Sequence, residues 1–220
     1  TQAIPTVNPF VAQTGLFSEQ TGISLQGVNY SSVAWGDYDK DADLDILLTG
    51  YTGTGPVSKI YRNNSDNTFT EQTGILLPGV YYGSAAWGDY DKDGDPDILL
   101  TGRLSSGQYI SKVFTNKGNN TFTEQTKISL IGVYNSSVAW GDYDNDGDQD
   151  ILLAGSIGST NISKIYRNMG DSTFTEQTTI ILQGVTQGSI VWGDYDNDND
   201  LDILIGGSGN SKIYRNNGDN

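Results

Sequence analysis

The sequence predicts an all-β fold, specifically a β-propeller built from four-stranded blades. One motif, AWGDYD or VWGDYD, recurs four times at a nearly fixed step, and its tryptophans stand 52, 53 and 52 residues apart: Trp35, Trp87, Trp140 and Trp192. The chain has 28 glycines, one methionine and no cysteine or histidine among 220 residues, so β-branched, aromatic and small residues must fill the core. No segment has a sustained helical period. Short four-stranded units that repeat in this way are typical of propellers.

Each repeat of about 52 residues divides into four short strands. In the first repeat, SSVAWGDYD from Ser31 alternates and ends in an Asp-rich turn, and DILLTG from Asp45 is an apolar run suited to burial on both faces. The third strand is SKIYRNN from Ser58, and the fourth is TFTEQT from Thr68. Gly, Asn, Asp and Ser separate these segments, as turns require.

The phase of the repeats predicts how the ring closes. The last repeat stops at RNNGDN, before its fourth strand, whereas residues 16–21 read LFSEQT and match that strand. We therefore expect a tail at 1–15, a four-repeat propeller at 16–220, and a last blade completed by the N-terminal strand, which removes exposed sheet edges. An open β-solenoid would not need this strand. Closure between two chains, and closure with further repeats, remain open alternatives.

An Asp-rich loop follows the first strand of every repeat, at residues 37–45, 89–97, 142–150 and 194–202. Of the 23 Asp residues, 20 lie in these windows, at loop positions 1, 3, 5, 7 and 9. Calcium takes six to eight oxygen ligands, and alternate side chains of a tight loop can supply them. The sequence therefore predicts up to four calcium sites, with these residues: Asp37, Asp39, Asp41, Asp43 and Asp45; Asp89, Asp91, Asp93, Asp95 and Asp97; Asp142, Asp144, Asp146, Asp148 and Asp150; Asp194, Asp196, Asp198, Asp200 and Asp202.

An EF-hand would use a bidentate Glu at loop position 12, but this chain has an apolar residue there: Leu48, Leu100, Leu153 and Ile205. The loop therefore joins two strands. Without a cation, its carboxylates repel one another, at a cost on the order of 1 kcal/mol for each close pair even in high dielectric.

The loop spacing, with its flanking WGDYD and DILLTG, resembles the FG-GAP/VCBS repeat family, which includes the seven-bladed propellers of integrin α-subunits and related fungal lectins. The resemblance implies calcium ligands from the side chains at loop positions 1, 3, 5 and 9 and from the main-chain carbonyl at position 7. The family usually has Gly at position 6. Gly94 and Gly147 keep it, whereas Ala42 and Asn199 replace it, so loop one is expected to be the weakest site.

The connections on the face opposite the calcium loops differ between the repeats, as binding loops on a scaffold do. Tyrosines in or beside them can stack on sugars or anchor a protein interface, and they are candidate ligand residues: Tyr30, Tyr51, Tyr81, Tyr82, Tyr109 and Tyr134. Local packing is the alternative. The four tryptophans are expected in the core. Cations that recur in and after the third strand are expected to pair with a neighbouring blade: Lys59, Arg62, Lys112, Lys164, Arg167, Lys212 and Arg215.

Composition excludes several functions. The formal charge of -15 argues against nucleic acid, and no apolar run is long enough to span a membrane. The absence of His and Cys argues against an enzyme, although relatives include calcium-dependent lyases. We expect a calcium-stabilised, secreted or cell-surface binding or adhesion module, lectin-like, for a carbohydrate or protein. A subunit that self-associates by exchange of the N-terminal strand is the alternative, and a polysaccharide-active enzyme comes third.

Overall fold

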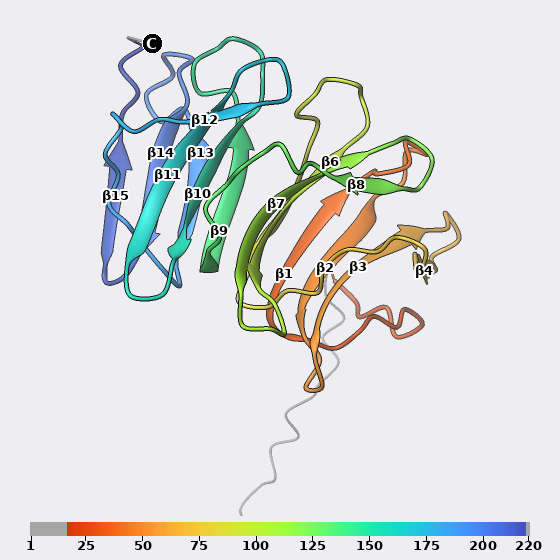
Figure 1. The fold of residues 1–220 in the computed structure, drawn as a ribbon. Helices are drawn as coiled ribbons and strands as arrows, with labels where there is room; N and C mark the ends of the chain where they lie inside the picture. Colours follow the sequence, from red (N-terminus) through yellow and green to blue (C-terminus); the bar gives the residue numbers. More distant parts are fainter. Residues whose placement is uncertain (1–16, 219–220) are drawn as a thin grey trace, which may run out of the picture.

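The structure is a computed structural model that describes residues 17–218, and all of their regular structure is β-strand. The strands form four antiparallel sheets that follow one another in chain order, here called sheets 1 to 4 (Figure 1). The tail expected at 1–15, like Leu16, lies outside the described residues. Within residues 17–218 there is no helix that could cross a membrane.

Consecutive strands pair within each sheet, so every connection inside a sheet is a hairpin. Sheet 1 contains β1 (Asn29–Gly36), β2 (Asp45–Tyr51), β3 (Pro56–Asn63) and β4 (Phe69–Glu71). Sheet 2 contains β5 (Ala85–Gly88), β6 (Asp97–Arg103), β7 (Tyr109–Asn116) and β8 (Phe122–Glu124). Sheet 3 contains β9 (Tyr134–Gly141), β10 (Asp150–Ser156), β11 (Asn161–Asn168) and β12 (Phe174–Glu176). Sheet 4 contains β13 (Ser189–Gly193), β14 (Asp202–Gly207) and β15 (Asn210–Tyr214).

The second strand of each sheet carries the core, as its continuous apolar run predicts. β6 and β10 are buried along nearly their whole length because sheets lie against both of their faces. β2 is buried to a similar extent, although only sheet 2 lies against sheet 1, because Val28 and Phe69 pack on its other face. Three leucines at the same repeat position are 0% exposed: Leu47, Leu99 and Leu152. Their counterpart in β14, Leu204, is 49% exposed, because no further sheet formed by residues 17–218 covers it.

Consecutive sheets join through a tryptophan that lies on a glycine of the preceding sheet. A Cβ on Gly36 would stand 2.5 Å from Trp87, so only glycine allows the contact. The same tryptophan stacks on Tyr38 at 6.2 Å between ring centroids. This joint repeats between sheets 2 and 3 and between sheets 3 and 4, where Trp140 and Trp192 take the place of Trp87. Trp87, Trp140 and Trp192 therefore act in packing, as expected, whereas the expectation that Trp35 lies in the core is wrong, because this side chain is 62% exposed.

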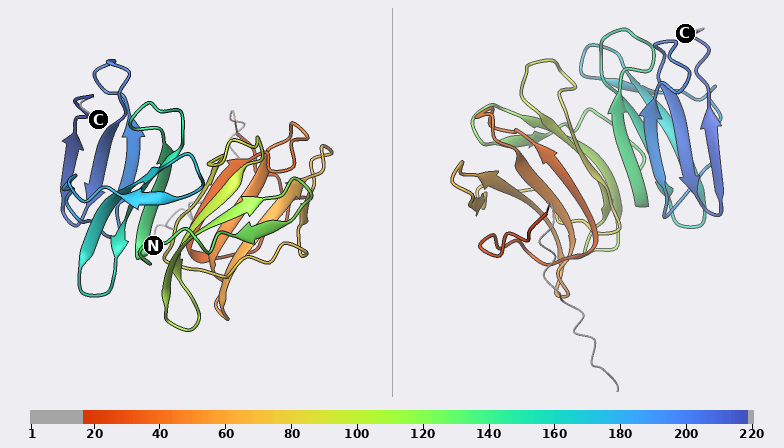
Figure 2. Two further views of the ribbon diagram at one scale, coloured as in Figure 1. Left: turned by 45° about the horizontal axis from the view of Figure 1, so that its top comes forward. Right: turned by 180° about the vertical axis from the view of Figure 1, so that it is seen from behind.

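The sheets form an open row instead of a closed ring, with sheets 1 and 4 at its two ends (Figure 2). The strand expected at 16–21 is not formed in the described part of that segment: residues 17–20 have no strand, Phe17 is 93% exposed, and sheet 4 has three strands. The following segment is bound to sheet 1, because the Gln26 amide donates to Tyr61 Oη at 3.1 Å and Val28 packs beside this ring. The segment around Gln26 and Val28 therefore lies beside the first sheet, and no strand of residues 17–21 completes the last one.

Candidate metal centres

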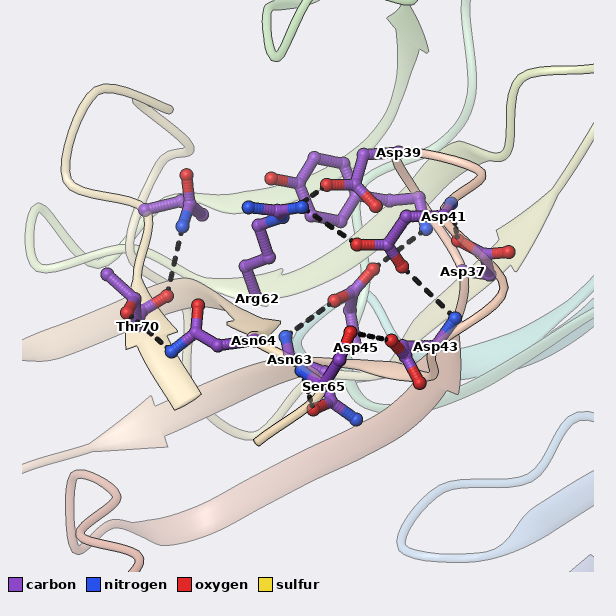
Figure 3. A network of polar contacts seen from close by, with 12 residues as sticks. Asp37, Asp39, Asp41, Asp43, Asp45, Arg62, Asn63, Asn64, Ser65 and Thr70 are labelled. Atoms are coloured by element: carbon purple, nitrogen blue, oxygen red, sulfur yellow. Dashed lines mark hydrogen bonds and ion pairs between the residues drawn. The ribbon is translucent and has the colours of Figure 1, made fainter. Parts of the chain in front are cut away.

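Each Asp-rich loop joins the first and second strands of its sheet and is wound tightly by its own carboxylates (Figure 3). In loop one, Asp37 accepts hydrogen bonds from the amides of Asp41 and Ala42, at 3.1 and 3.0 Å. Asp41 in turn accepts from the amide of Asp43 at 3.0 Å. Equivalent bonds form in loops three and four. The side chains at loop positions 1 and 5 thus fold the loop onto itself.

The Asp at loop position 9 begins the second strand and is buried. Asp45 is 0% exposed, and its two oxygens accept the amides of Tyr38 and Asn63 at 3.1 and 2.8 Å. Burial raises the pKa of Asp45 to about 6, that of Asp97 to about 8 and that of Asp150 to about 7. A buried carboxylate is disfavoured as an anion unless a positive charge lies near it. A bound cation would supply that charge.

The loop backbone is left-handed at positions 4 and 6. Position 4 has φ near +60° in all four loops, at Lys40, Lys92, Asn145 and Asn197. Position 6 has φ of 85° and 87° at Gly94 and Gly147, whereas Ala42 has φ of 72° and Asn199 has φ of 73°. Because a Cβ is disfavoured in this region, Ala42 is strained where glycine is not.

Three carboxylates in each loop offer oxygens that all lie within 4.8 Å of one another. The four groups are Asp37, Asp39 and Asp41; Asp89, Asp91 and Asp97; Asp142, Asp144 and Asp146; Asp194, Asp196 and Asp202. Several carboxylate oxygens at positions 1 and 3 are buried and accept no hydrogen bond, namely Oδ1 of Asp39, Asp89, Asp91 and Asp144. Buried carboxylate oxygens that lie close together and accept no hydrogen bond are ligands that fit a hard cation such as calcium.

The side chains at loop position 7 point away from these clusters and toward neighbouring groups. Asp95 pairs with Lys40 of the preceding loop at 2.6 Å, and Asp148 pairs with Lys92 at 2.6 Å. Asn145 donates to Asp200 at 2.7 Å in the same way. Because these side chains are engaged elsewhere, the main-chain carbonyl is the group through which position 7 could bind an ion.

An arginine at the end of the third strand reaches back to the loop of its own sheet. Arg62 contacts Asp39 at 2.5 Å and Asp41 at 2.8 Å, as Figure 3 shows. Arg167 and Arg215 make the same pair of contacts in sheets 3 and 4. Sheet 2 has Thr115 at this position, and its hydroxyl lies 2.8 Å from Tyr90 Oη. Loop two therefore differs from the other three in having no arginine across positions 3 and 5.

The expectation that the cations in and after the third strand pair with a neighbouring blade is wrong for the six that form ion pairs, because all six pair within their own sheet. Lys59 binds Glu71 at 2.8 Å, Lys112 binds Glu124 at 2.6 Å, and the corresponding pair forms in sheet 3 between Lys164 and Glu176. Each pair joins the third and fourth strands of one sheet, because their antiparallel register places the two residues close together. The cross-sheet ion pairs come instead from loop position 4, which the sequence did not single out.

The candidate tyrosines gather at the sheet ends opposite the Asp-rich loops. Tyr30 and Tyr82 lie 4.1 Å apart between ring centroids, and Tyr81 lies 5.0 Å from Tyr82 and 5.3 Å from Tyr51. Arg103 stands over the Tyr81 ring at 5.9 Å. A second pair stacks at 4.3 Å and consists of Tyr109 and Tyr134. Sequence variation alone could not show that four of these rings form one cluster.

An all-β chain of repeated four-stranded units, each with an acidic loop between its first two strands, defines a propeller-like repeat protein. The FG-GAP-like repeat family matches residues 49–100, 103–153 and 142–205, which is more than half of the chain. The chain therefore belongs to the FG-GAP-like repeat family. None of the curated proteins with which the chain was compared is similar to it in sequence.

Proposed function

We propose that the chain is a calcium-stabilised propeller module that works outside the cell by binding a carbohydrate or protein ligand. The observation that carries this proposal is the fourfold recurrence of converging carboxylates, with buried oxygens that lack hydrogen-bond donors. Membership in the FG-GAP-like repeat family supports a binding or adhesion module of propeller type. Calcium near the millimolar level outside cells suits modules with dissociation constants of about 10⁻⁴–10⁻³ M.

In each loop the side chains at positions 1, 3, 5 and 9 and the carbonyl at position 7 would hold the ion. Calcium would offset the mutual repulsion of these carboxylates and the cost of burying the Asp at position 9. That residue accepts the backbone amides of the loop and of the third strand, as Asp97 does from Tyr90 and Asn116, at 3.2 and 2.8 Å. A bound ion would thus fix the loop to the sheet, so we assign it a structural role.

The ligand would bind the opposite face, at the cluster of Tyr30, Tyr51, Tyr81 and Tyr82. These rings lie in or beside connections that differ between repeats, and Tyr30 is 55% exposed. Exposed aromatic rings can stack on the apolar face of a sugar or anchor a protein contact. Arg103, over the Tyr81 ring, adds a cation to a chain that is otherwise strongly acidic.

Isothermal titration with calcium tests the metal sites one at a time. Removal of the position-3 carboxylate from any loop, as in Asp91→Asn, should reduce the number of calcium ions bound by one, because that oxygen has no other partner. Asp66→Asn is the matched control, since Asp66 caps Thr68 in an exposed turn outside the loops and should leave the stoichiometry unchanged. A wild-type chain that takes up no calcium would refute the metal assignment.

Binding to a glycan array tests the ligand face separately. Tyr82→Ala should abolish retention of any glycan that the wild-type chain holds, whereas Met169→Ala, an exposed apolar residue outside this cluster, should not. Equal loss from both variants, or no loss from Tyr82→Ala, would contradict the assignment of the tyrosine face. Cleavage of the same polysaccharides instead of retention would identify an enzyme.

A further inference from the structure

Sheet 1 exposes apolar residues whose counterparts are buried in the other sheets. Val33 is 66% exposed, whereas the residues at the same repeat position, Ala85, Val138 and Ile190, are 6%, 8% and 1% exposed. Trp35 is 62% exposed, and in the part of the chain that the structure describes no sheet precedes sheet 1. This surface of sheet 1 therefore has the same kinds of residue as the surfaces by which sheets 2, 3 and 4 pack on the sheet before them.

Sheet 4 exposes the residues that, in sheets 1 to 3, pack against the following sheet. Tyr195 is 56% exposed and Ile213 is 60% exposed. Their counterparts in the other sheets are at most 6% exposed: Tyr38, Tyr90 and Tyr143; Ile60, Val113 and Ile165. Gly193 has nothing within 4 Å of a built Cβ, whereas the glycines at that position in sheets 1 to 3 each lie under a tryptophan. The surface of sheet 4 over Gly193 could therefore accept a tryptophan ring, as the equivalent surfaces of sheets 1 to 3 do.

Hydrogen-bonding groups that pair between neighbouring sheets at the internal joints lack these partners in sheets 1 and 4, at the two ends of the row. In the internal joints the Nδ2 atoms of Asn116, Asn168 and Asn216 donate to a tyrosine carbonyl of the preceding sheet, at 2.8, 2.8 and 2.7 Å. Among the described residues, the Nδ2 atom of Asn63 in sheet 1 donates only to the carbonyl of Leu44 in its own loop, at 3.3 Å. The carbonyl that would match it belongs to Tyr195 of sheet 4.

Within residues 17–218, sheet 4 has no fourth strand, and a cavity of about 270 Å³ lies beside it. Tyr143, Trp192 and Ile203 are among its lining residues. In the two preceding joints a phenylalanine of the fourth strand fills the equivalent space: Phe122 lies 6.2 Å from Tyr38 and Phe174 lies 5.9 Å from Tyr90, between ring centroids. In the described part of the chain, no phenylalanine takes this place beside Tyr143.

The segment at residues 17–21 matches the missing strand in sequence, spacing and charge. Phe17 is 93% exposed and precedes Trp35 by 18 residues, the same interval as from Phe122 to Trp140. Glu19 occupies the position of the glutamates that pair with lysine in sheets 1 to 3. Lys212 occupies the position of those lysines and has no ion-pair partner among residues 17–218.

We propose that a second copy of this chain fills both vacancies, with sheet 1 of each copy docked on sheet 4 of the other and residues 17–21 added to β15. In every internal joint the fourth strand and the next sheet's first strand come from one continuous segment, so the donor of residues 17–21 must also place its own β1 against sheet 4. Sheets 1 and 4 of one chain stand at opposite ends of the row (Figure 1). A partner copy can supply both parts without disturbing the three joints already made.

Two copies would give eight blades in a ring with twofold symmetry and two equivalent joints. Propellers have typically four to eight blades, so this number is within the known range. A head-to-tail contact closes into a ring when the rotation permits and otherwise grows into a fibre. The proposal commits to the closed pair.

Light scattering in excess calcium tests the assembly. The wild-type chain should have twice the 23.7 kDa chain mass. Phe17→Asp and Tyr195→Arg should each be monomeric and folded, because both side chains are exposed within one copy, and Leu76→Asp, at an exposed residue outside the two surfaces, should stay dimeric. A 1:1 mixture of the two monomeric variants should recover a dimer through its one intact joint. A monomeric wild-type chain, or a fibre, would overturn the proposal.

A disulfide tests the register, because the natural chain has no cysteine. Arg62 faces Thr70 between β3 and β4, so the proposed strand should place Ser18 of one copy opposite Arg215 of the other. Oxidation of Ser18→Cys/Arg215→Cys should give a covalent dimer on a non-reducing gel. The control, Arg62→Cys/Thr70→Cys, should link within one chain and run as a monomer. A monomeric product from the first variant would show closure within one chain and contradict exchange, as would failure to link while the control links.

Discussion

Backbone conformation at single residues distinguishes the four metal loops. Position 6 is left-handed in all of them, but only Gly94 and Gly147 reach this conformation without cost. Ala42, with φ of 72°, has the side chain least suited to it. The sequence identified Ala42 as the weak point because the family usually has glycine there, and its positive φ confirms the strain.

Ala42→Gly should stabilise the calcium-bound protein by about 1 kcal/mol, because it relieves a left-handed alanine. Gly94→Ala should destabilise it by about the same amount, since a Cβ there meets only Lys40 Nζ at 3.9 Å and backbone strain is the main effect. Urea unfolding in calcium measures both changes. If the two substitutions changed the free energy of unfolding in the same direction, the assignment of strain to position 6 would be contradicted.

The arginines across the loops compete with calcium for the same carboxylates. Arg167 pairs with Asp144 and Asp146, at 2.6 and 3.0 Å. Arg167→Thr should therefore raise calcium affinity at loop three, and Thr115→Arg should lower it at loop two, each roughly threefold to tenfold for one charge a few ångströms from the ion in a water-like dielectric. Calorimetric titration of both variants checks this. Affinity that falls in Arg167→Thr would show that the arginine supports the site.

At the scale of the strands, most of the fold followed from periodicity. The continuous apolar run predicted the buried second strand, and the Asp-rich turn predicted the hairpin before it. The pairing of Lys59 with Glu71 could not be predicted, because it depends on the register between the third and fourth strands, which the sequence does not show. The contact of Arg62 with Asp39 was missed for a similar reason, since 23 residues separate the two side chains along the chain.

The second strands offer a matched test of core packing. Leu99→Ala should cost about 3 kcal/mol of unfolding free energy, because Leu99 is 0% exposed and its removal leaves a cavity. Leu204→Ala removes the same group at the same repeat position but at 49% exposure, so in the Phe17→Asp background it should cost less than about 1 kcal/mol. Chemical denaturation measures both. Similar losses would contradict the open face of sheet 4.

For the whole molecule, the sequence predicted four repeats of short strands, but not the conformation of residues 17–21. The phase of the repeats indicated that residues 16–21 replace the missing strand of the last unit, whereas in the structure Phe17 is exposed and Gln26 is bound to sheet 1. Repeat phase shows which strand is absent. It cannot show whether one chain curves far enough to supply it, because that depends on the angle between neighbouring sheets.

Calcium is central to the proposed fold, since each of the four sheets has its first hairpin closed by a cluster of carboxylates. Even one site at 100 times its dissociation constant adds about 2.7 kcal/mol to stability. Thermal unfolding should therefore be followed in 10-fold steps of free calcium and in excess chelator, with magnesium as the control cation. We predict a melting temperature that rises with calcium and falls by roughly 10 °C or more in chelator. A melting temperature that is the same in calcium and in chelator would contradict the calcium-stabilised fold.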